Sequence, residues 1–324
     1  MTKFVMALAL LGSLGVAAPA EAQQYPSRPI TLVVPLAPGG STDTVGRIVA
    51  EGMRTFLGQP VIVENTAGAG GTIALGRVVR SAPDGYTILI GQWGTNVATG
   101  AVYSLPFDLL KDFEPIGLMT VQPFLIVGKK DLPANNLKEL IAWLKANAGK
   151  VSVGTAGVGS AGHIASVLLQ NTIGSQFEFI PYRSAGLAIQ DLIGGRLDMN
   201  MDTPATSGPH LSRGSYKGYA VTSSTRSPIV PQIPTVDEAG LPGFYFGFWH
   251  GLWVPKDTPK DVIAKLNAAV KSALADPETR KRLSDTGQEI YPPDRVTPEA
   301  LASFQKAEIE KWWPIIKAAG ITAQ

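Results

Sequence analysis

The sequence predicts an α/β protein built from mainly parallel sheets with flanking helices. Short apolar runs rich in Val and Ile alternate along the chain with longer stretches in which apolar residues recur every three or four positions. Gly-rich turns separate most of these segments, and strands that alternate with helices form parallel sheets covered on both faces. The length of 324 residues is sufficient for about two domains.

The composition argues against several classes of function. The chain has 28 Lys and Arg against 26 Asp and Glu, and this near-neutral balance argues against a nucleic-acid partner, which usually requires a strongly basic face. The absence of Cys excludes disulfides, thiolate zinc sites, iron–sulfur clusters and cysteine nucleophiles. Because only 3 His are present, a His-rich metal site is also unexpected. We therefore expect no metal and no cofactor.

The N-terminus has the three-part pattern of a secretory signal peptide. Lys3 precedes an apolar run from Phe4 to Ala18, and Ala20-Glu21-Ala22 then offers a cleavage site between small residues. The run is shorter than the roughly 20 residues that a membrane span needs. We expect that residues 1–22 are removed and that an exported chain begins at Gln23.

The first half of the chain predicts three strands that alternate with helices. Ile30–Leu36 is a continuous apolar run, typical of a buried strand. The helix Thr44–Phe56 follows, with Ser41, Thr42 or Asp43 as its candidate cap. The next expected elements are strand Val61–Glu64, helix Thr72–Ser81 and strand Thr87–Ile90, which ends in the turn Gly91–Asn96.

The second half repeats this pattern and ends in three helices. The expected strands are Phe124–Val127, Lys150–Gly154, Phe177–Tyr182, Leu197–Met201, Tyr219–Thr222 and Gly247–Val254. The expected helices are Leu137–Ala148, one that ends near Thr172, Leu187–Ile193, Pro259–Ala275, Pro277–Thr286 and Pro298–Ala318.

Two Gly-rich turns are candidate anion sites. Ligands of open α/β sheets bind beyond the carboxyl ends of the strands. The turns Pro38–Asp43 and Thr155–His163 lie at such ends, and each opens a helix whose free N–H groups and dipole attract an anion. One turn lies in each half, so the two helix ends could face each other across a cleft that suits a small carboxylate. Alternatively, both are only tight turns that need positive φ.

A dinucleotide site is the main alternative. Gly157-x-Gly159-x-x-Gly162 matches the dinucleotide fingerprint between a strand and a helix. The acidic residue expected at the end of the following strand is missing, because that strand ends in Tyr182-Arg183. Arg183 could instead reach a carboxylate. A nucleotide-dependent enzyme therefore stays open as the alternative function.

The acidic residues and histidines do not form a catalytic constellation. Capping and ion pairing explain Asp43 and Glu64, and a local hydrogen bond explains His163 at its helix start. His210 and His250 fall in segments that we interpret as loops without a function. We expect no catalytic residue.

A series of motifs runs through the chain in a fixed order. They are Tyr25-Pro26-Ser27-Arg28-Pro29-Ile30, Pro38–Asp43 with Arg47, Val63-Glu64-Asn65 with Gly68-Ala69-Gly70-Gly71, Asp84-Gly85-Tyr86-Thr87, Gly157-x-Gly159-Ser160 with His163, Pro181-Tyr182-Arg183 with Asp191–Gly195, Pro234-Thr235-x-x-Glu238-x-Gly240, and Gly251-Leu252-Trp253-x-Pro255 with Thr258-Pro259. In these motifs the whole chain resembles the periplasmic solute-binding proteins of the tripartite tricarboxylate transporter family, also called the Bug family.

The resemblance implies a two-lobed fold of the type II periplasmic binding proteins, which closes on its ligand like a Venus flytrap. Lobe 1 is expected to comprise residues 23–121 plus 251–324, and lobe 2 residues 122–250. The chain would cross near Thr120–Phe124 and return near Phe248–Leu252, so that strands Phe124–Val127 and Gly247–Val254 would lie side by side as a hinge.

The resemblance also implies a function. A monomer in the periplasm would capture a small mono-, di- or tricarboxylate and deliver it to the large and small membrane subunits of its transporter. A sensor that presents the same ligand to a membrane receptor would use the same site, so this possibility stays open.

The expected ligand-binding residues lie in the turns of both lobes. Trp93 stands where the family usually has a small residue, and an indole at the cleft could favour an aromatic or longer apolar acid. The full set is Pro38, Gly39, Gly40, Ser41, Thr42, Asp43, Asn65, Ala67, Gly68, Trp93, Thr95, Thr155, Gly157, Gly159, Ser160, His163, Arg183 and Asp202.

Overall fold

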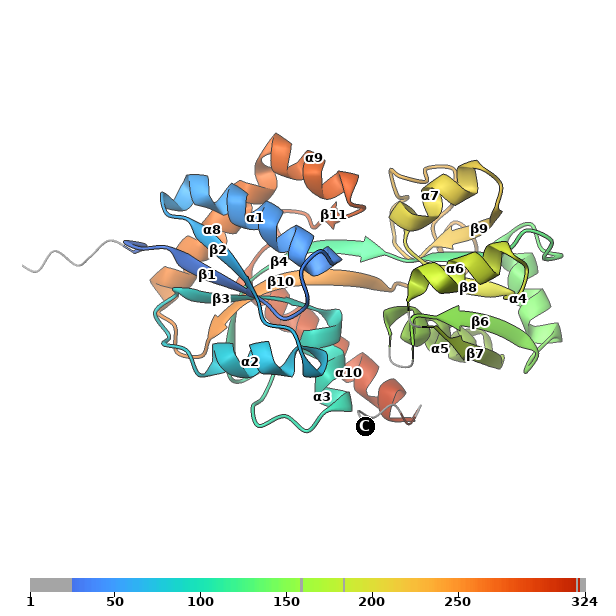
Figure 1. Cartoon of the computed structure of the whole chain (residues 1–324), viewed down its shortest axis with the longest axis horizontal. Helices are drawn as coiled ribbons and strands as arrows, with labels where there is room; N and C mark the ends of the chain where they lie inside the picture. The colour runs from blue at the N-terminus through green and yellow to red at the C-terminus, as the bar shows by residue number, and fades with distance from the viewer. Residues whose placement is uncertain (1–24, 158–159, 183, 319, 321–324) are drawn as a thin grey trace, which may run out of the picture.

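The computed structural model describes residues 25–157, 160–182, 184–318 and 320, and its architecture confirms the α/β class. The chain forms two sheets with helices on both faces of each, placed side by side along the long axis (Figure 1). The sheets are mixed and not mainly parallel, because the strands that connect the two sheets run antiparallel to their neighbours. The predicted signal peptide lies outside the described residues.

The first sheet has the strand order β11-β4-β10-β3-β1-β2. Its strands are β1 (Ile30–Val34), β2 (Val61–Asn65), β3 (Thr87–Gln92), β4 (Phe113–Pro123), β10 (Gly247–Pro255) and β11 (Glu289–Ile290). The elements that surround it are α1 (Ser41–Leu57), η1 (Ala69–Gly71), α2 (Thr72–Val79), η2 (Gly94–Ala98), α3 (Thr99–Val102), α8 (Lys260–Ala275), α9 (Pro277–Asp285) and α10 (Pro298–Ala318). In Figure 1, α1, α8 and α9 lie on one face and α2, α3 and α10 on the other.

The second sheet has the strand order β7-β6-β8-β5-β9. Its strands are β5 (Leu125–Lys129), β6 (Val151–Thr155), β7 (Phe177–Pro181), β8 (Met199–Asp202) and β9 (Tyr216–Val221). Its helices are α4 (Leu137–Ala146), α5 (Ala161–Ile173), α6 (Ala185–Ile193) and α7 (Pro204–Ser212). Among the helices of the described residues, none is long and apolar enough to cross a membrane.

The two sheets are joined by two long strands. β4 and β10 pair antiparallel over their whole length, from Gly247 opposite Pro123 to Pro255 opposite Phe113 (Figure 1). The expected pairing of Phe124–Val127 with Gly247–Val254 is therefore wrong, because β5 pairs with β8 and β9 instead. β4 was not predicted because Glu114, Pro115 and Gly117 interrupt its apolar residues, so its sequence has neither the alternation of a half-buried strand nor the continuous apolar run of a buried one. The lobe boundaries near residues 121 and 250 stay a prediction.

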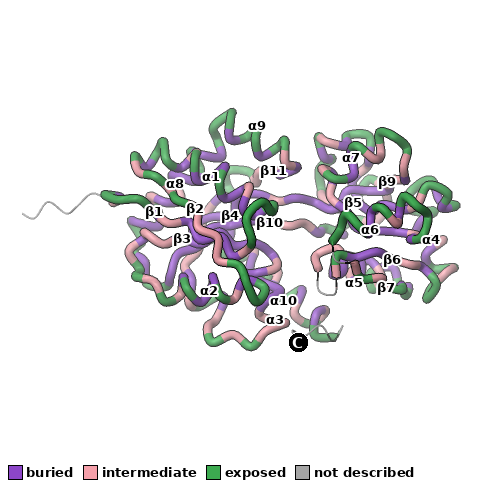
Figure 2. Tube along the Cα trace, viewed as in Figure 1, coloured by how far each residue is buried: buried purple, intermediate pink, exposed green. Residues whose placement is uncertain are grey.

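The hydrophobic core is continuous between the two sheets on one side of these strands. Phe124, Phe246, Trp93 and Trp312 pack edge to face or tilted, with ring centroids 5.1–5.4 Å apart. This aromatic cluster belongs to a core that extends from α10 to α4 and α5. Figure 2 shows buried strands in both sheets and exposed outer faces on the helices. The connection between the sheets is thus packed on the aromatic side.

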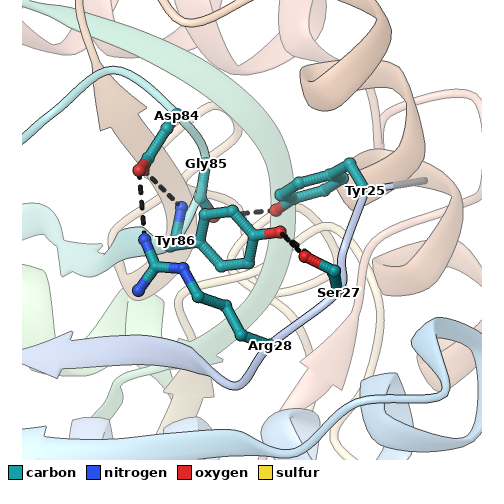
Figure 3. Close-up of polar contacts among 6 residues, drawn as sticks. All are labelled: Tyr25, Ser27, Arg28, Asp84, Gly85 and Tyr86. Carbon is teal, nitrogen blue, oxygen red and sulfur yellow. Dashed lines mark hydrogen bonds and ion pairs between the residues drawn. The ribbon is translucent and has the colours of Figure 1, made fainter. Parts of the chain in front are cut away.

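The start of the described chain is anchored to the loop before β3 (Figure 3). The Tyr25 hydroxyl donates to the Gly85 carbonyl over 2.7 Å. The Arg28 guanidinium lies 3.9 Å above the ring of Tyr86 and forms an ion pair with Asp84 at 3.2 Å. The anchor lies at the end of the first sheet that is far from the second sheet (Figure 1). Two of the sequence motifs therefore hold the N-terminal segment in place.

Two predicted element boundaries differ near the strand ends. Helix α1 begins at Ser41, so the residues proposed as its cap lie inside its first turn, and Gly40 takes the cap position without a side-chain bond. The predicted turn Gly91–Asn96 is instead the end of β3 followed by the π-helix η2. Helix α7 was also missed, because Pro204 and Pro209 obscure its pattern.

Candidate functional site

A cavity of about 240 Å³ lies between the two sheets. Ser41 at the start of α1 borders it from the first sheet, and Ser160 before α5 borders it from the second. Phe124 and Phe248, next to the crossings of the chain, form part of its wall. The remaining lining residues are Gln122, Ala156, Ala161, Gly162, Ala185, Asn200, Met201, Asp202 and Thr203.

On the side of the first sheet, the cavity faces the N-terminus of α1. The first backbone bond of this helix runs from Thr44 N to Gly40 O at 3.0 Å, so the N–H groups of Ser41, Thr42 and Asp43 precede the helical ladder. The Ser41 hydroxyl accepts a hydrogen bond from Gln288 Nε2 at 3.1 Å. Its own O–H is thereby left to donate toward the cavity.

Asp43 fixes the shape of this turn from behind. Its carboxylate accepts bonds from Gly39 N at 2.9 Å, Arg47 Nε at 3.0 Å and Asn65 Nδ2 at 2.9 Å. Burial alone would raise the pKa of Asp43, but the bonds from Arg47, Gly39 and Asn65 outweigh it and lower the pKa. The ion-pair interpretation of Asp43 is confirmed, and its side chain is engaged within the turn.

The Thr42 side chain also points away from the cavity. Thr42 is 1% exposed, and its hydroxyl lies 3.3 Å from His250 Nε2. His250 lies in β10 and is fully buried, so the interpretation of this histidine as a loop residue is wrong. Four residues of the first Gly-rich turn are exposed: Pro38, Gly39, Gly40 and Ser41. Of the residues in this turn, Ser41 is the one that lines the cavity.

On the side of the second sheet, the cavity faces the N-terminus of α5. Ser160 caps this helix, and its hydroxyl accepts the His163 N–H at 3.3 Å. The Ser160 O–H, like that of Ser41, is left to donate toward the cavity. Gly157 has φ +102°, a conformation that other residues rarely adopt. Gly159 lies outside the described residues.

His163 and Thr155 support this turn from the interior. The imidazole of His163 packs edge-on against Phe179, with ring centroids 4.7 Å apart, and burial lowers its pKa. Thr155 is 2% exposed at the end of β6. The backbone N–H of His163 donates to the Ser160 cap, and the lining of the cavity includes neither the His163 nor the Thr155 side chain.

Asp202 places a buried carboxyl group at the end of β8. It is 4% exposed and accepts a hydrogen bond from Ser207 Oγ at 2.6 Å, and Ser207 in turn accepts one from Tyr216 Oη at 3.0 Å. Burial raises the pKa of Asp202, although the bonds from Ser207 and the Thr203 N–H act in the opposite direction. Thr203, the next residue, caps α7.

Several expected ligand residues do not reach the cavity. Trp93 is 1% exposed and packs against Phe246 and Trp312, so its indole lies in the core and not in the wall of the cavity. Thr95 is 1% exposed and donates to Asn96 Oδ1 at 2.8 Å. Thr95 lies in the π-helix η2, and Trp93 directly precedes this helix. Asn65, Ala67 and Gly68 lie outside the cavity wall, and Arg183 lies outside the described residues.

The residues that the sequence analysis missed come mainly from the crossings. Gln122, Phe124 and Phe248 lie where the chain was expected to pass between the lobes. A residue at a hinge borders the cleft that the hinge opens, and this rule was the signal that could have found them. Asn200 and Met201 could have been predicted from their position in β8, because they directly precede Asp202 at the end of this strand.

The chemistry of the cavity favours an anion with an apolar body. Two helix N-termini and two serine hydroxyls offer hydrogen-bond donors, while Phe124, Met201 and Phe248 offer apolar surface. Across the described part of the chain, no cluster of His, Asp and Glu has the geometry to hold a metal ion.

Comparisons with known proteins agree with this geometry. A family profile described as the tripartite tricarboxylate transporter family receptor matches residues 45–321. The periplasmic binding protein BugD is 41% identical, with a TM-score of 0.72 over 92% of this chain and 100% of its own. MatC from Rhodopseudomonas palustris, solved with bound malate, is 39% identical, with a TM-score of 0.72 over 90% of this chain and 100% of its own.

A third similar structure holds a longer acid. Rpa4515 from R. palustris, solved with adipate, is 30% identical, with a TM-score of 0.74 over 92% of this chain and 100% of its own. The profile covers most of the chain, and the similar structures cover nearly all of it.

Proposed function

The chain belongs to the tripartite tricarboxylate transporter family of receptors, which are periplasmic solute-binding proteins, and from this premise we propose that it captures a small carboxylate between its two lobes. The observation that carries the proposal is the pair of serines at facing helix N-termini. Ser41 and Ser160 both border the cavity, and each hydroxyl already accepts a bond from behind. Each can therefore donate to the same anion.

The backbone completes the proposed carboxylate site. The N–H groups at the start of α1 and α5 supply further donors at the positive ends of the two helix dipoles. Gly39 and Gly157 have φ of +85° and +102°, and these turns let the backbone approach a ligand closely. Gly159 stays in the proposed contact set because it belongs to the second turn. Arg183 stays in it because it follows Tyr182, whose N–H donates to the Thr155 carbonyl at the start of that turn.

The remaining wall defines the proposed ligand further. Phe124, Met201 and Phe248 would cover an apolar body of the acid. Asp202 would disfavour a second carboxylate close to β8, unless one of the two groups carries a proton, because like charges repel. The malate of MatC and the adipate of Rpa4515 are the first acids to compare with this chemistry.

The proposed role in the cell is delivery to a transporter. The chain would be exported through the signal peptide at residues 1–22, would act as a monomer in the periplasm, and would pass its ligand to the large and small membrane subunits. A sensor role would use the same site. Binding assays with purified transporter subunits separate the two.

Titration calorimetry tests the proposed function. The protein is first unfolded and refolded to remove any ligand carried through purification. It is then titrated with malate, adipate, citrate, benzoate and NAD. We expect binding of at least one acid and none of NAD. Binding of NAD alone, or hydrolysis or oxidation of a bound acid, would show that the chain is an enzyme.

A further inference from the structure

A buried histidine links the hinge strands to the first turn of α1. His250 lies in β10, between Gln92 of β3 and Thr120 of β4. It is 0% exposed. The pairing of β10 with β4 shifts register between His250 and Gly251, which leaves Met119 as an extra residue on β4. Such bulges bend a strand and redirect its side chains.

Both ring nitrogens of His250 face threonine hydroxyls. Nε2 lies 3.3 Å from Thr42 Oγ1 in the first turn of α1, and Nδ1 lies 3.1 Å from Thr120 Oγ1 on β4. A neutral imidazole donates through one nitrogen and accepts through the other, and a hydroxyl can do either. The ring can therefore satisfy both threonines at once.

The same ring lies behind two parts of the cavity wall. Phe248, two residues away on the same face of β10, packs edge-on at a centroid distance of 5.9 Å. The Gln288 side chain, which favours a higher pKa of the imidazole, donates to the hydroxyl of Ser41. His250 thus contacts Phe248 directly and Thr42, the sequence neighbour of Ser41, through its Nε2 atom. His250 itself does not line the cavity.

We propose that His250 is a positioning residue for the carboxylate site, holding the first turn of α1 against hinge strand β4 and supporting the ring of Phe248. The proposal rests on the proposed function, because it assigns His250 a role in binding at that cavity. Through His250, the first turn of α1, which offers donors to the ligand, is bonded to β4, the strand that leads from the first sheet to the second.

The uncharged state of the ring is consistent with this role. Burial lowers the pKa of His250 to about 3, although Gln288 acts in the opposite direction. The ring therefore stays neutral at the pH of the periplasm and keeps one donor and one acceptor. An apolar side chain at this position would avoid the cost of taking polar groups out of water. The buried imidazole therefore lowers the stability of the fold unless it forms its hydrogen bonds to Thr42 and Thr120.

Methyl NMR of the ligand-free protein tests the positioning directly. The mobility of the Thr42 methyl group is compared in the wild type, in His250→Phe, which keeps a ring but loses both bonds, and in Thr120→Val, which loses one. His250→Gln is the conservative variant, since an amide offers a donor and an acceptor. Leu252→Val is the matched control, because Leu252 is a fully buried core residue on the same face of β10.

We expect the Thr42 methyl group to become more mobile in His250→Phe, less so in Thr120→Val, and to recover partly in His250→Gln. Leu252→Val should lower the unfolding temperature without this change. An unchanged Thr42 methyl signal in both His250→Phe and Thr120→Val, or an equal change in Leu252→Val, would overturn the proposal.

Calorimetry with malate and adipate as probes provides the second arm. We expect His250→Phe to weaken binding of the probe about tenfold, because a first turn of α1 that is no longer held in place must be ordered when the ligand binds. Leu252→Val should bind as the wild type does, and equal affinities in His250→Phe and wild type would contradict the proposal. If the wild type binds neither acid, that result counts against the proposed ligand class, and the Thr42 methyl signal alone decides the role of His250.

Discussion

The two turns that face each other across the cavity are held in different ways. The turn before α1 is fixed from behind by side chains, since Asp43 accepts three hydrogen bonds and Thr42 adjoins His250. In the described part of the turn before α5, Gly157 has positive φ, Ser160 caps the helix and His163 packs against Phe179. The turn on the side of the first sheet thus has a network of side-chain bonds around one carboxylate, and the described part of the turn on the side of the second sheet has a cap and a ring contact.

The difference between the turns suggests separate tasks. A turn fixed by several bonds keeps its donors aligned before the ligand arrives, which lowers the entropy cost of binding. A turn whose described residues show one cap and one ring contact would adjust more readily if the proposed lobes close on the ligand.

The pH dependence of stability should have opposite signs on the two sides of the cavity. The pKa of His250 is lowered to about 3 in the folded protein. Its contribution to the free energy of unfolding is therefore fully present above the ordinary pKa of 6.5 and is lost as the pH falls toward 3. We expect its loss to approach about 1.4 kcal/mol per pH unit in this range. The pKa of Asp202 is raised, so its contribution is present below 3.8 and is lost as the pH rises through the raised value.

Denaturant unfolding of variants at several pH values checks both signs. His250→Phe should remove the loss of stability that the wild type shows as the pH falls from 6.5 toward 3. Asp202→Asn should remove the loss of stability that the wild type shows as the pH rises above 3.8. A His250→Phe variant with the same acid slope as the wild type would mean that another group causes it.

Removal of the Ser160 hydroxyl should weaken ligand binding. A hydrogen bond to a charged group is worth roughly 1.5–3 kcal/mol, so Ser160→Ala should lower the affinity about tenfold to a hundredfold. The lost cap should also cost about 1 kcal/mol of stability. Calorimetry with the best acid of the panel measures the first effect, and Ser41→Ala is its counterpart on the other turn. Native affinity in both variants would place the ligand elsewhere.

Removal of the Asp43 carboxylate should disturb the first turn and leave the second intact. Asp43→Ala leaves Arg47, Asn65 and the Gly39 N–H without their shared acceptor, and we expect a loss of about 2 kcal/mol in the free energy of unfolding. Chemical shifts should change around α1 and not around α5. Equal shifts around both helices would show that the two turns are coupled in the ligand-free protein.

The N-terminal anchor should have the smallest effect and none on binding. The Arg28–Asp84 pair is largely exposed, and such pairs contribute less than about 1 kcal/mol. Arg28→Ala should therefore shift the unfolding temperature slightly and leave the affinity for any acid unchanged. A clear loss of affinity would connect the far end of lobe 1 (Figure 3) to the cavity.

Local patterns in the sequence were sufficient for most elements. The continuous apolar run at Ile30 and the helical periodicities near Leu137 and Pro298 predicted elements that the structure contains. β4 escaped because Glu114, Pro115 and Gly117 interrupt its apolar residues, and η2 because a π-helix has no signature in single-sequence patterns.

The sequence also identified the two turns that border the cavity. Ser41 and Ser160 follow strand ends and open helices, and this local chemistry is visible without a structure. Which side chains of the turns reach the cavity was not visible. Thr42 and Asp43 have the same kind of position as Ser41, yet the helical rotation of about 100° per residue turns them toward His250 and Arg47.

The α/β class, the turns that offer anion donors and the family of the chain were thus readable from the amino-acid sequence. The three-dimensional fold sets which residues meet at the cavity, because Ser41, Phe248 and Ser160 are brought together only when two sheets are joined by β4 and β10. It also decided that Trp93 is a core residue and that His250 lies behind the site. Burial and contact depend on segments far apart in the chain, and no local pattern contains that information.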